Sequence, residues 1–320
     1  MAESLHSKLN DPSRGVYFLG TTPPKARTDD QQMAEIADKL LARLTQLEYD
    51  GLIVYDIQDE SSRVDTPRPF PFIGTRDPRA YAALLQEKSG RETITYKSVS
   101  QRDRASFEQW LAEAWDKYGV RNLVLVGSPS QTADIQLSLS DAYQATAEID
   151  LAFNLGGVTI AERHAKKGNE HQRLLEKTAK GCQYFISQAV YDAPATIDLL
   201  HEYGAQCRAE NRRPNRVILT FTPCGSAKTL AFMEWLGISV SKATAAQILN
   251  APNPLSESVR ICRRNLDLIL DACLPYQIPI GLNIESLTNR KEEIEASIRL
   301  FKLLKARLEE RLVLQELDQS

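Results

Sequence analysis

The sequence predicts a single (β/α)8 barrel, from two regularities and one missing motif. Short apolar runs rich in β-branched and aromatic residues occur eight times along the 320 residues, and longer segments with helical spacing separate them. Strands that alternate with helices form parallel sheets, and eight such units close most naturally into a barrel. A doubly wound open sheet is the main alternative, but no GxGxxG motif follows the first run.

The expected strands follow one another along the whole chain. In order, they are residues 16–22, 51–57, 93–99, 122–128, 151–157, 184–190, 216–222 and 278–284. Between them, segments such as 29–47 and 107–118 carry apolar residues at three-to-four spacing, which is typical of helices packed on a barrel. We expect 1–320 to form one domain, with an N-terminal tail over 1–14 and a helical extension over 306–320.

Two segments are longer than a minimal barrel needs. Residues 59–77 are rich in proline and charge, which predicts a long loop after the second strand. Residues 238–275 predict extra helices between strands 7 and 8, split near 250–254. Long loops after barrel strands often carry ligand contacts.

The composition excludes several classes of partner. A net charge of −3 gives no basic footprint for nucleic acid, and no apolar run is long enough to span a membrane. The five cysteines form no CxxC pair, and the N-terminus has no apolar segment typical of a signal peptide. We therefore expect a cytoplasmic protein, and the polar C-terminal helix leaves a homo-oligomer open.

The sequence offers little support for a metal site or a hydrolase. His164 and His171 are seven residues apart and could share a helix face, but no carboxylate stands at ligand spacing, so we expect no metal. No GxSxG motif occurs. Cys224 follows strand 7 as either a nucleophile or a small buried thiol, and the second interpretation is favoured.

Residues at the carboxyl ends of barrel strands face the ligand. The ends expected here are rich in amides, hydroxyls and a few charges, namely Tyr96, Ser128, Asn154, Gln188, Glu285 and Arg290. Such groups suit a polar heterocycle recognised by hydrogen bonds. The basic run 163–167 follows strand 5 and is either a solvated charge cluster or a pyrophosphate site.

Four motifs resemble those of the methylenetetrahydrofolate reductases, a family of flavin-dependent (β/α)8 barrels. They are the Pro23-Pro24-Lys25 turn, the segment 162–188, the strand end 125–128 and the turn 287–290. The resemblance is distant and covers roughly residues 16–304. It implies an oxidoreductase that passes hydride from NAD(P)H through FAD to the folate substrate 5,10-methylenetetrahydrofolate.

The resemblance also implies roles for individual residues. Gln188 would meet the pterin or the flavin edge, and Arg290 would meet the anionic tail of the folate. His164, Arg173 and Lys177 would lie along the ribityl and phosphate groups of the flavin. We add Tyr96 to the substrate-binding residues and Asn154 to the cofactor-binding residues, because both are expected on the rim.

Four positions depart from the family pattern. The strand-1 glutamate that is thought to protonate the folate is Gly20, and the strand-4 aspartate is Ser128. The arginine two residues before that aspartate is Val126, and the tyrosine near the flavin is Ile160. The acid must then come from another strand end: Glu285, Asp56 or Glu60. We favour Glu285 because strand 8 neighbours strand 1 in a closed barrel, although it could instead pair with Arg290 or Lys25. Glu285 and Ser128 are the residues that we assign to catalysis.

These departures keep three other functions open. The first is a folate-dependent methyl transfer that needs neither flavin nor reduction. The second is a flavin-free reductase, in which hydride passes directly from the nicotinamide to the folate. The third is a non-enzymatic barrel that serves as a partner subunit.

Overall fold

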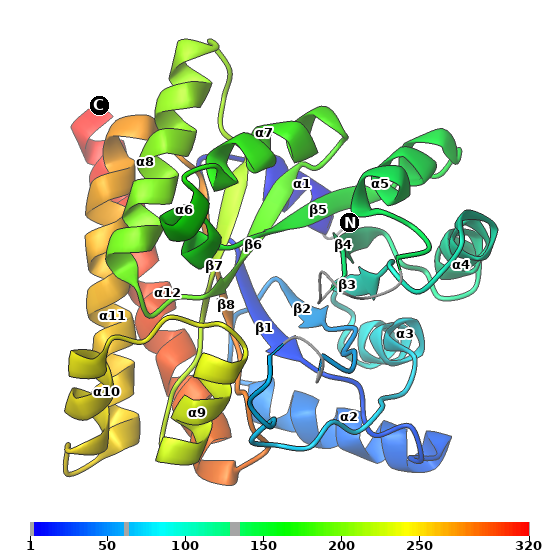
Figure 1. Cartoon of the computed structure of the whole chain (residues 1–320), viewed down its shortest axis with the longest axis horizontal. Helices are drawn as coiled ribbons and strands as arrows, with labels where there is room; N and C mark the ends of the chain where they lie inside the picture. Colours follow the sequence, from blue (N-terminus) through cyan, green and yellow to red (C-terminus); the bar gives the residue numbers. More distant parts are fainter. Residues whose placement is uncertain (1–2, 61–63, 129–134, 320) are drawn as a thin grey trace.

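The chain forms a closed barrel of eight parallel strands (Figure 1). The computed structural model describes residues 3–60, 64–128 and 135–319. Each strand pairs with the next, and β8 returns to β1 through Tyr17–Leu282, Phe18–Asn283 and Leu19–Ile284. The predicted fold class is therefore confirmed. The strands are β1 (Tyr17–Thr21), β2 (Gly51–Val54), β3 (Thr93–Ser98), β4 (Asn122–Val126), β5 (Asn154–Thr159), β6 (Tyr184–Ala189), β7 (Arg216–Phe221) and β8 (Ile280–Ile284).

Seven of the eight predicted runs contain a strand, and the eighth, 151–157, overlaps β5 but begins and ends too early, because β5 occupies Asn154–Thr159. The apolar residues before it are loop residues, and Phe153 packs edge-on against Trp115 outside the strand. The two glycines, which resemble a turn in the sequence, lie within the strand instead. A Cβ on Gly156 would lie 2.4 Å from the ring of Tyr184, so this close approach of β5 and β6 requires glycine.

Helices surround the barrel, and several of them are fixed at their starts by side-chain caps. Asp29, Asp103 and Ser138 each accept a hydrogen bond from a backbone N–H three residues on. The helices before β7 are α1 (Leu5–Asn10), α2 (Asp30–Leu44), α3 (Pro78–Ser89), α4 (Arg104–Asp116), α5 (Leu139–Glu148), α6 (Ala161–Lys167), α7 (Glu170–Ala179) and α8 (Ala193–Ala209).

Both predicted insertions are confirmed in the described residues. Between β7 and β8 lie α9 (Ala227–Trp235), α10 (Lys242–Leu249), α11 (Pro254–Cys273) and the short η1 (Leu274–Tyr276), with the break at the predicted 250–254. The loop after β2 has no regular element over 64–77 apart from a bridge between Thr75 and Lys25, and its residues 61–63 lie outside the described part.

The N-terminal residues do not form the expected tail. Residues Leu5–Asn10 form α1, and Leu5 and Leu9 are buried against the side chains that fill the barrel interior, including Phe18 and Ile218. The guanidinium of Arg216, itself 2% exposed, donates hydrogen bonds to the carbonyls of Leu9, Asp11, Arg14 and Ile280. Because Arg216 opens β7, these contacts close the amino-terminal end of the barrel.

The expected C-terminal extension is the continuation of the last barrel helix. Helix α12 runs without a break over Lys291–Gln319, and Leu304 and Leu308 remain buried in its middle. Helices α8, α11 and α12 lie side by side along one flank of the barrel (Figure 1). None of the described helices combines the length and the apolar character that crossing a bilayer requires.

Candidate ligand-binding cleft

A cleft of about 2020 Å³ opens at the carboxyl ends of the strands. The residues that line it include one from the end of each of six strands, namely Thr21, Tyr55, Ser98, Gln188, Thr220 and Glu285. Ordinary small-molecule sites measure about 300–1,000 Å³. The cleft therefore has room for more than one ligand of that size, at the end of the barrel where the sequence predicts the ligand.

One corner of the cleft is built around Glu285, which follows β8. Asn283, fully buried, donates from Nδ2 to the hydroxyl oxygen of Tyr55 at 2.8 Å and to Thr220 Oγ1 at 3.1 Å. The Tyr55 hydroxyl also lies against the Glu285 carboxyl group and interacts with it. Burial raises the pKa of Glu285 above its ordinary value, and the interaction with Tyr55 only partly opposes this shift. The carboxyl is therefore biased toward its protonated form.

The same corner explains why residue 20 is glycine. A Cβ at Gly20 would lie 2.9 Å from Tyr55 Cε2, 3.0 Å from its hydroxyl oxygen and 3.1 Å from Glu285 Cβ. Tyr55 and Glu285 thus fill the space that a side chain on β1 would enter. The carboxyl group expected near this point of the rim is present, but it comes from the neighbouring strand.

The other two candidate acids differ from Glu285. Asp56 accepts from Lys97 Nζ at 2.8 Å and from the backbone of Ser98 at 2.9 Å, and its side chain is 7% exposed. This carboxylate is held in a buried ion pair with Lys97. Glu60 lines the cleft from the loop after β2. Glu285 forms no ion pair with Arg290 or Lys25 among the described residues.

Three of the predicted side chains lie at the cleft on strands β3, β4 and β6. Gln188 donates from Nε2 to the carbonyl of Leu236 at 3.0 Å, which fixes the amide at the cleft wall. Tyr96 packs edge-on against Tyr55, with ring centroids 4.8 Å apart. Ser128 lines the cleft just after β4. A fourth predicted residue, Arg290, is exposed and also lines the cleft, just before α12. Its Nη1 lies 3.4 Å from Ser226 Oγ.

Helices α6 and α7 give the cleft a basic wall, which consists of Arg163, Lys166, Lys167, Arg173 and Lys177. The carboxylate of Glu170, fully buried, lies 3.0 Å from Arg163 Nη1 and 3.4 Å from Arg173 Nε. It fixes both guanidinium groups while the two lysines of α6 stay exposed. The Nζ of Lys177 donates to the carbonyl of Val158, and burial lowers the pKa of Lys177 to about 8.

Two of the predicted cofactor residues do not lie at the cleft. Asn154 begins β5 instead of ending it, and its Nδ2 donates to Asn122 Oδ1 at 2.8 Å at the start of β4. It therefore lies at the opposite end of the barrel. His164 lies on the face of α6 that turns toward α8, where its Nε2 is 3.6 Å from Glu202 Oε2. The α-helical period places its neighbours Arg163 and Lys167 at the cleft and His164 behind them.

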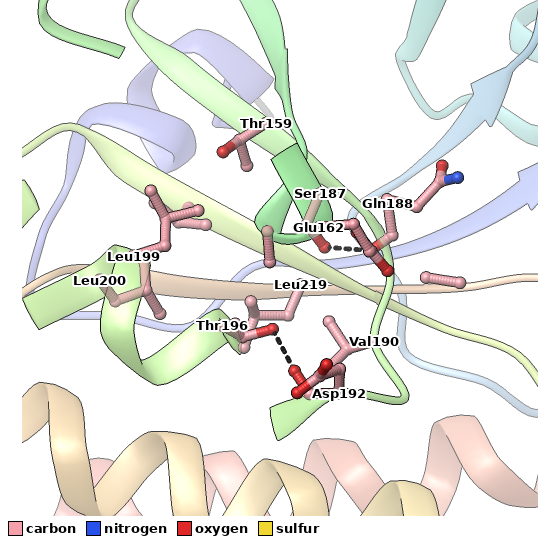
Figure 2. A pocket seen from close by; sticks show the side chains of 13 residues that line it. Thr159, Glu162, Ser187, Gln188, Val190, Asp192, Thr196, Leu199, Leu200 and Leu219 are labelled. Carbon is pink, nitrogen blue, oxygen red and sulfur yellow. Dashed lines mark hydrogen bonds between the residues drawn. The ribbon is translucent and has the colours of Figure 1, made fainter. Parts of the chain in front are cut away.

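A second, small cavity and the cysteine Cys224 are both unsuited to chemistry on a ligand. A small cavity behind β6 is lined by Thr159, Glu162, Ser187 and Asp192 among others (Figure 2), but its volume of about 10 Å³ holds no more than one water. Cys224 is fully buried, and burial raises the pKa of its thiol to about 11. It is therefore the small buried thiol that the sequence favours.

Tyr55 and Glu170 were not predicted as site residues, whereas Asn283 was expected at the end of strand 8 but without its buried hydrogen bonds. Tyr55 lies inside the expected strand 51–57, where an aromatic residue resembles ordinary core. Glu170 lies in a run of charged residues that resembles a solvated helix. Only the three-dimensional contacts show that these polar groups are buried.

The closed barrel with its open carboxyl-end cleft defines a (β/α)8 barrel protein. A solved structure with a TM-score of 0.80 is 36% identical to this chain, covering 94% of this chain and 99% of the other. It is that of an uncharacterized protein from Clostridium thermocellum that binds two copies of 5-methyl-5,6,7,8-tetrahydrofolic acid. The present chain belongs to the same family as that protein.

More distant structures show no more than a general likeness. The dihydropteroate synthase of Xanthomonas albilineans is 11% identical, with a TM-score of 0.46 and coverage of 93% of this chain and 94% of the other. The carboxyl transferase domain of Rhizobium etli pyruvate carboxylase is 10% identical, with a TM-score of 0.49 and coverage of 97% and 49%. Neither bears on function. No protein-family model and no curated protein matches the chain.

Proposed function

We propose that this protein binds reduced folates in the carboxyl-end cleft and acts on the one-carbon unit that they carry. The observation that carries the proposal is the family relationship, because the Clostridium thermocellum protein binds 5-methyl-5,6,7,8-tetrahydrofolic acid. The match at 36% identity covers 94% of this chain and 99% of the other. A folate has a polar pterin at one end and a glutamate carboxylate at the other, and the cleft has groups suited to each.

The amide of Gln188 suits the pterin. Its Nε2 is bound to the Leu236 carbonyl, and its Oε1 accepts no hydrogen bond from the described residues. This oxygen is free to accept an N–H of the pterin ring. Arg290 and the basic wall supply cations for the carboxylates of the tail. The edge-on pair of Tyr55 and Tyr96 offers an aromatic surface at the cleft.

Calorimetric titration of the purified protein with 5-methyltetrahydrofolate tests this proposal. We expect saturable binding, with up to two molecules per chain in view of the cleft volume of about 2020 Å³. Gln188→Ala should weaken binding by roughly 1–3 kcal/mol, because a ligand group then loses its buried partner. Gln172→Ala, on the exposed face of α7, is the matched control and should bind normally. No heat at high micromolar ligand would refute the proposal.

We further propose a methylenetetrahydrofolate reductase-like reaction with Glu285 as the proton donor. In this reaction one C–N bond of the methylene bridge breaks, a proton goes to the departing nitrogen, and a hydride goes to the bridge carbon to give the methyl group. Glu285 is suited to the proton transfer because its raised pKa keeps the carboxyl protonated to higher pH. The Tyr55 hydroxyl orients this carboxyl through its interaction with it.

The basic wall fits the cofactor that such a reaction implies. Arg163 and Arg173 would hold the diphosphate of FAD, because guanidinium groups fixed by Glu170 bind phosphate oxygens, which leaves Lys166 and Lys167 for the folate tail. Bound FAD would supply the hydride that originates from NAD(P)H. A visible absorbance band near 450 nm in the protein, directly or after addition of FAD, is the expected observation. Glu285→Gln should then lower turnover by about 10²-fold or more while folate still binds.

A second function, folate-dependent methyl transfer without flavin, is favoured by one observation. His164, expected along the flavin, turns away from the cleft toward α8. Ser128 and Ile160 also replace the aspartate and tyrosine of the reductase pattern. A colourless protein that binds 5-methyltetrahydrofolate but cannot be reconstituted with FAD would support this function over the reductase.

A further inference from the structure

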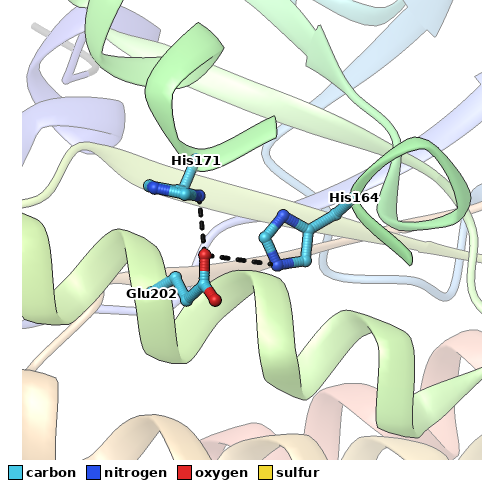
Figure 3. A group of neighbouring side chains, drawn as sticks. All are labelled: His164, His171 and Glu202. Carbon is cyan, nitrogen blue, oxygen red and sulfur yellow. Dashed lines mark ion pairs between the residues drawn. The ribbon is translucent and has the colours of Figure 1, made fainter. Parts of the chain in front are cut away.

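Three side chains outside the cleft converge behind its basic wall. His164 of α6, His171 of α7 and Glu202 of α8 point toward one another (Figure 3). Glu202 Oε2 lies 3.6 Å from His164 Nε2 and 2.9 Å from His171 Nδ1, and all three potential ligand atoms lie within 4.8 Å of one another. The sequence shows no carboxylate at ligand spacing from the two histidines. Glu202 supplies it from α8, which follows β6.

This donor set has the chemistry of a zinc site. Two imidazoles and one carboxylate, with water in the fourth position, are ligands that Zn²⁺ accepts at about 2.0–2.2 Å. Tetrahedral ligands at that distance from an ion stand roughly 3.3 Å apart. The observed separations of 2.9 and 3.6 Å from Glu202 lie on either side of this value. The two histidine nitrogens lie within 4.8 Å of each other, so an ion at the centre draws the two rings together.

The burial of the two histidines is the second observation. Their side chains are 5% and 9% exposed, and neither Nδ1 atom has a hydrogen-bond partner among the described residues. The His171 ring thus faces the carboxylate without the geometry of an N–H donor. A buried nitrogen that lacks a well-aligned hydrogen bond is costly, and coordination would replace the misaligned contact of His171 with Glu202 by a metal bond. The Glu202 side chain is 53% exposed, which leaves an entry path for the ion and space for a water.

We propose that His164, His171 and Glu202 bind a divalent transition-metal ion of the zinc type. The ion ties α6 and α7 to α8. Because the other faces of α6 and α7 carry Arg163, Lys166 and Arg173 at the cleft, the metal holds the basic wall in place from behind. The proposal depends only on these three side chains and not on the function of the cleft.

Titration of the chelator-treated, full-length protein with Zn²⁺ alone at neutral pH tests the site. We expect one equivalent to bind with micromolar affinity or better, and the melting temperature to rise on binding. Glu202→Gln and His171→Ala should each weaken the affinity at least about tenfold and abolish most of the rise. His6→Ala removes an exposed histidine near the N-terminus and should change neither quantity.

Each alternative outcome is decisive. Absence of stoichiometric binding would show that the three residues form only an ion pair, and the proposal would fail. Binding that is unaffected by Glu202→Gln and His171→Ala, or that is lost in His6→Ala, would place the ion elsewhere and would also refute it. Glu202→Gln is nearly isosteric at a half-exposed position, so this variant decides the question even if a histidine variant does not fold.

Discussion

Glu285 makes the behaviour of a single carboxyl group measurable in the stability of the whole chain. Its pKa in the folded protein is raised above the ordinary value of 4.5, so the folded chain holds this proton more tightly than the unfolded chain does. The corresponding stabilisation is present below about pH 4.5 and is lost as the pH rises through the raised pKa. Glu285→Gln stays neutral, so its stability relative to the wild type should increase between pH 5 and pH 8.

Chemical denaturation of both chains at the two pH values measures this difference. A difference in the free energy of unfolding that does not change with pH would contradict the account. Asp56→Asn is the informative contrast, because it leaves the buried ammonium of Lys97 without its partner. That variant should lose about 3–5 kcal/mol of stability, as expected when half of a buried ion pair is removed.

Gly20 provides a second test at the residue scale. In Gly20→Ala the new Cβ would lie 2.9–3.1 Å from atoms of Tyr55 and Glu285, so one of these side chains must move. We expect a loss of roughly 1–3 kcal/mol in the free energy of unfolding from this overpacking. We also expect weaker folate binding, because the moved groups line the cleft. Unchanged stability and affinity in this variant would contradict the close packing of Tyr55 and Glu285 against Gly20.

At the scale of elements, helix α6 should govern the recognition of the folate tail. Lys166 and Lys167 are exposed at the cleft and free to meet carboxylates. The double variant Lys166→Ala/Lys167→Ala should weaken the binding of a folate with several glutamates by roughly threefold to tenfold at low salt. The binding of a monoglutamate should change less. Lys302→Ala, exposed on α12, is the control, and an equal loss in it would show a non-specific charge effect.

The elements were largely predictable because their signals are local. Each strand is a short apolar run, and the break at 250–254 between α10 and α11 is marked by proline. What a helix faces is not local. The sequence gives His164 a place on α6, but the partner that draws it away from the cleft, Glu202, stands on α8. The glycines of β5 resemble a turn in the sequence, so the strand was predicted too early and Asn154 was placed at its carboxyl end. Their actual role depends on the ring of Tyr184 on the neighbouring strand, which the local sequence does not show.

For the whole molecule, the barrel has one closed end and one open end. Helix α1 and Arg216 close the amino-terminal end, while the cleft opens at the other. Leu9→Ala, at a side chain that is 2% exposed, should cost about 2–5 kcal/mol in the free energy of unfolding. Leu268→Ala, 48% exposed on α11, should cost less than about 0.5 kcal/mol. Similar effects of the two substitutions would contradict the role of α1 in closing the amino-terminal end of the barrel.

The closed barrel was predictable at this scale because eight alternating units leave few other topologies. The closure of the amino-terminal end by α1 was not predictable, since Leu5 and Leu9 are only two apolar residues in an otherwise polar segment. The substitution of Gly20 for the expected acid pointed to Glu285 only through the adjacency of strands 8 and 1, which closure of the barrel creates. The roles of Gln188, Arg290 and Ser128 stay predictions.

The central claim is that a reduced folate binds at the carboxyl ends of the strands. The structure of the protein in complex with 5-methyltetrahydrofolate tests it most directly. We predict a pterin within hydrogen-bonding distance of Gln188, a tail directed to Arg290 or to the basic wall, and the Glu285 carboxyl beside the one-carbon unit. A folate bound outside this cleft, or a cleft that stays empty at saturating ligand, would contradict the account.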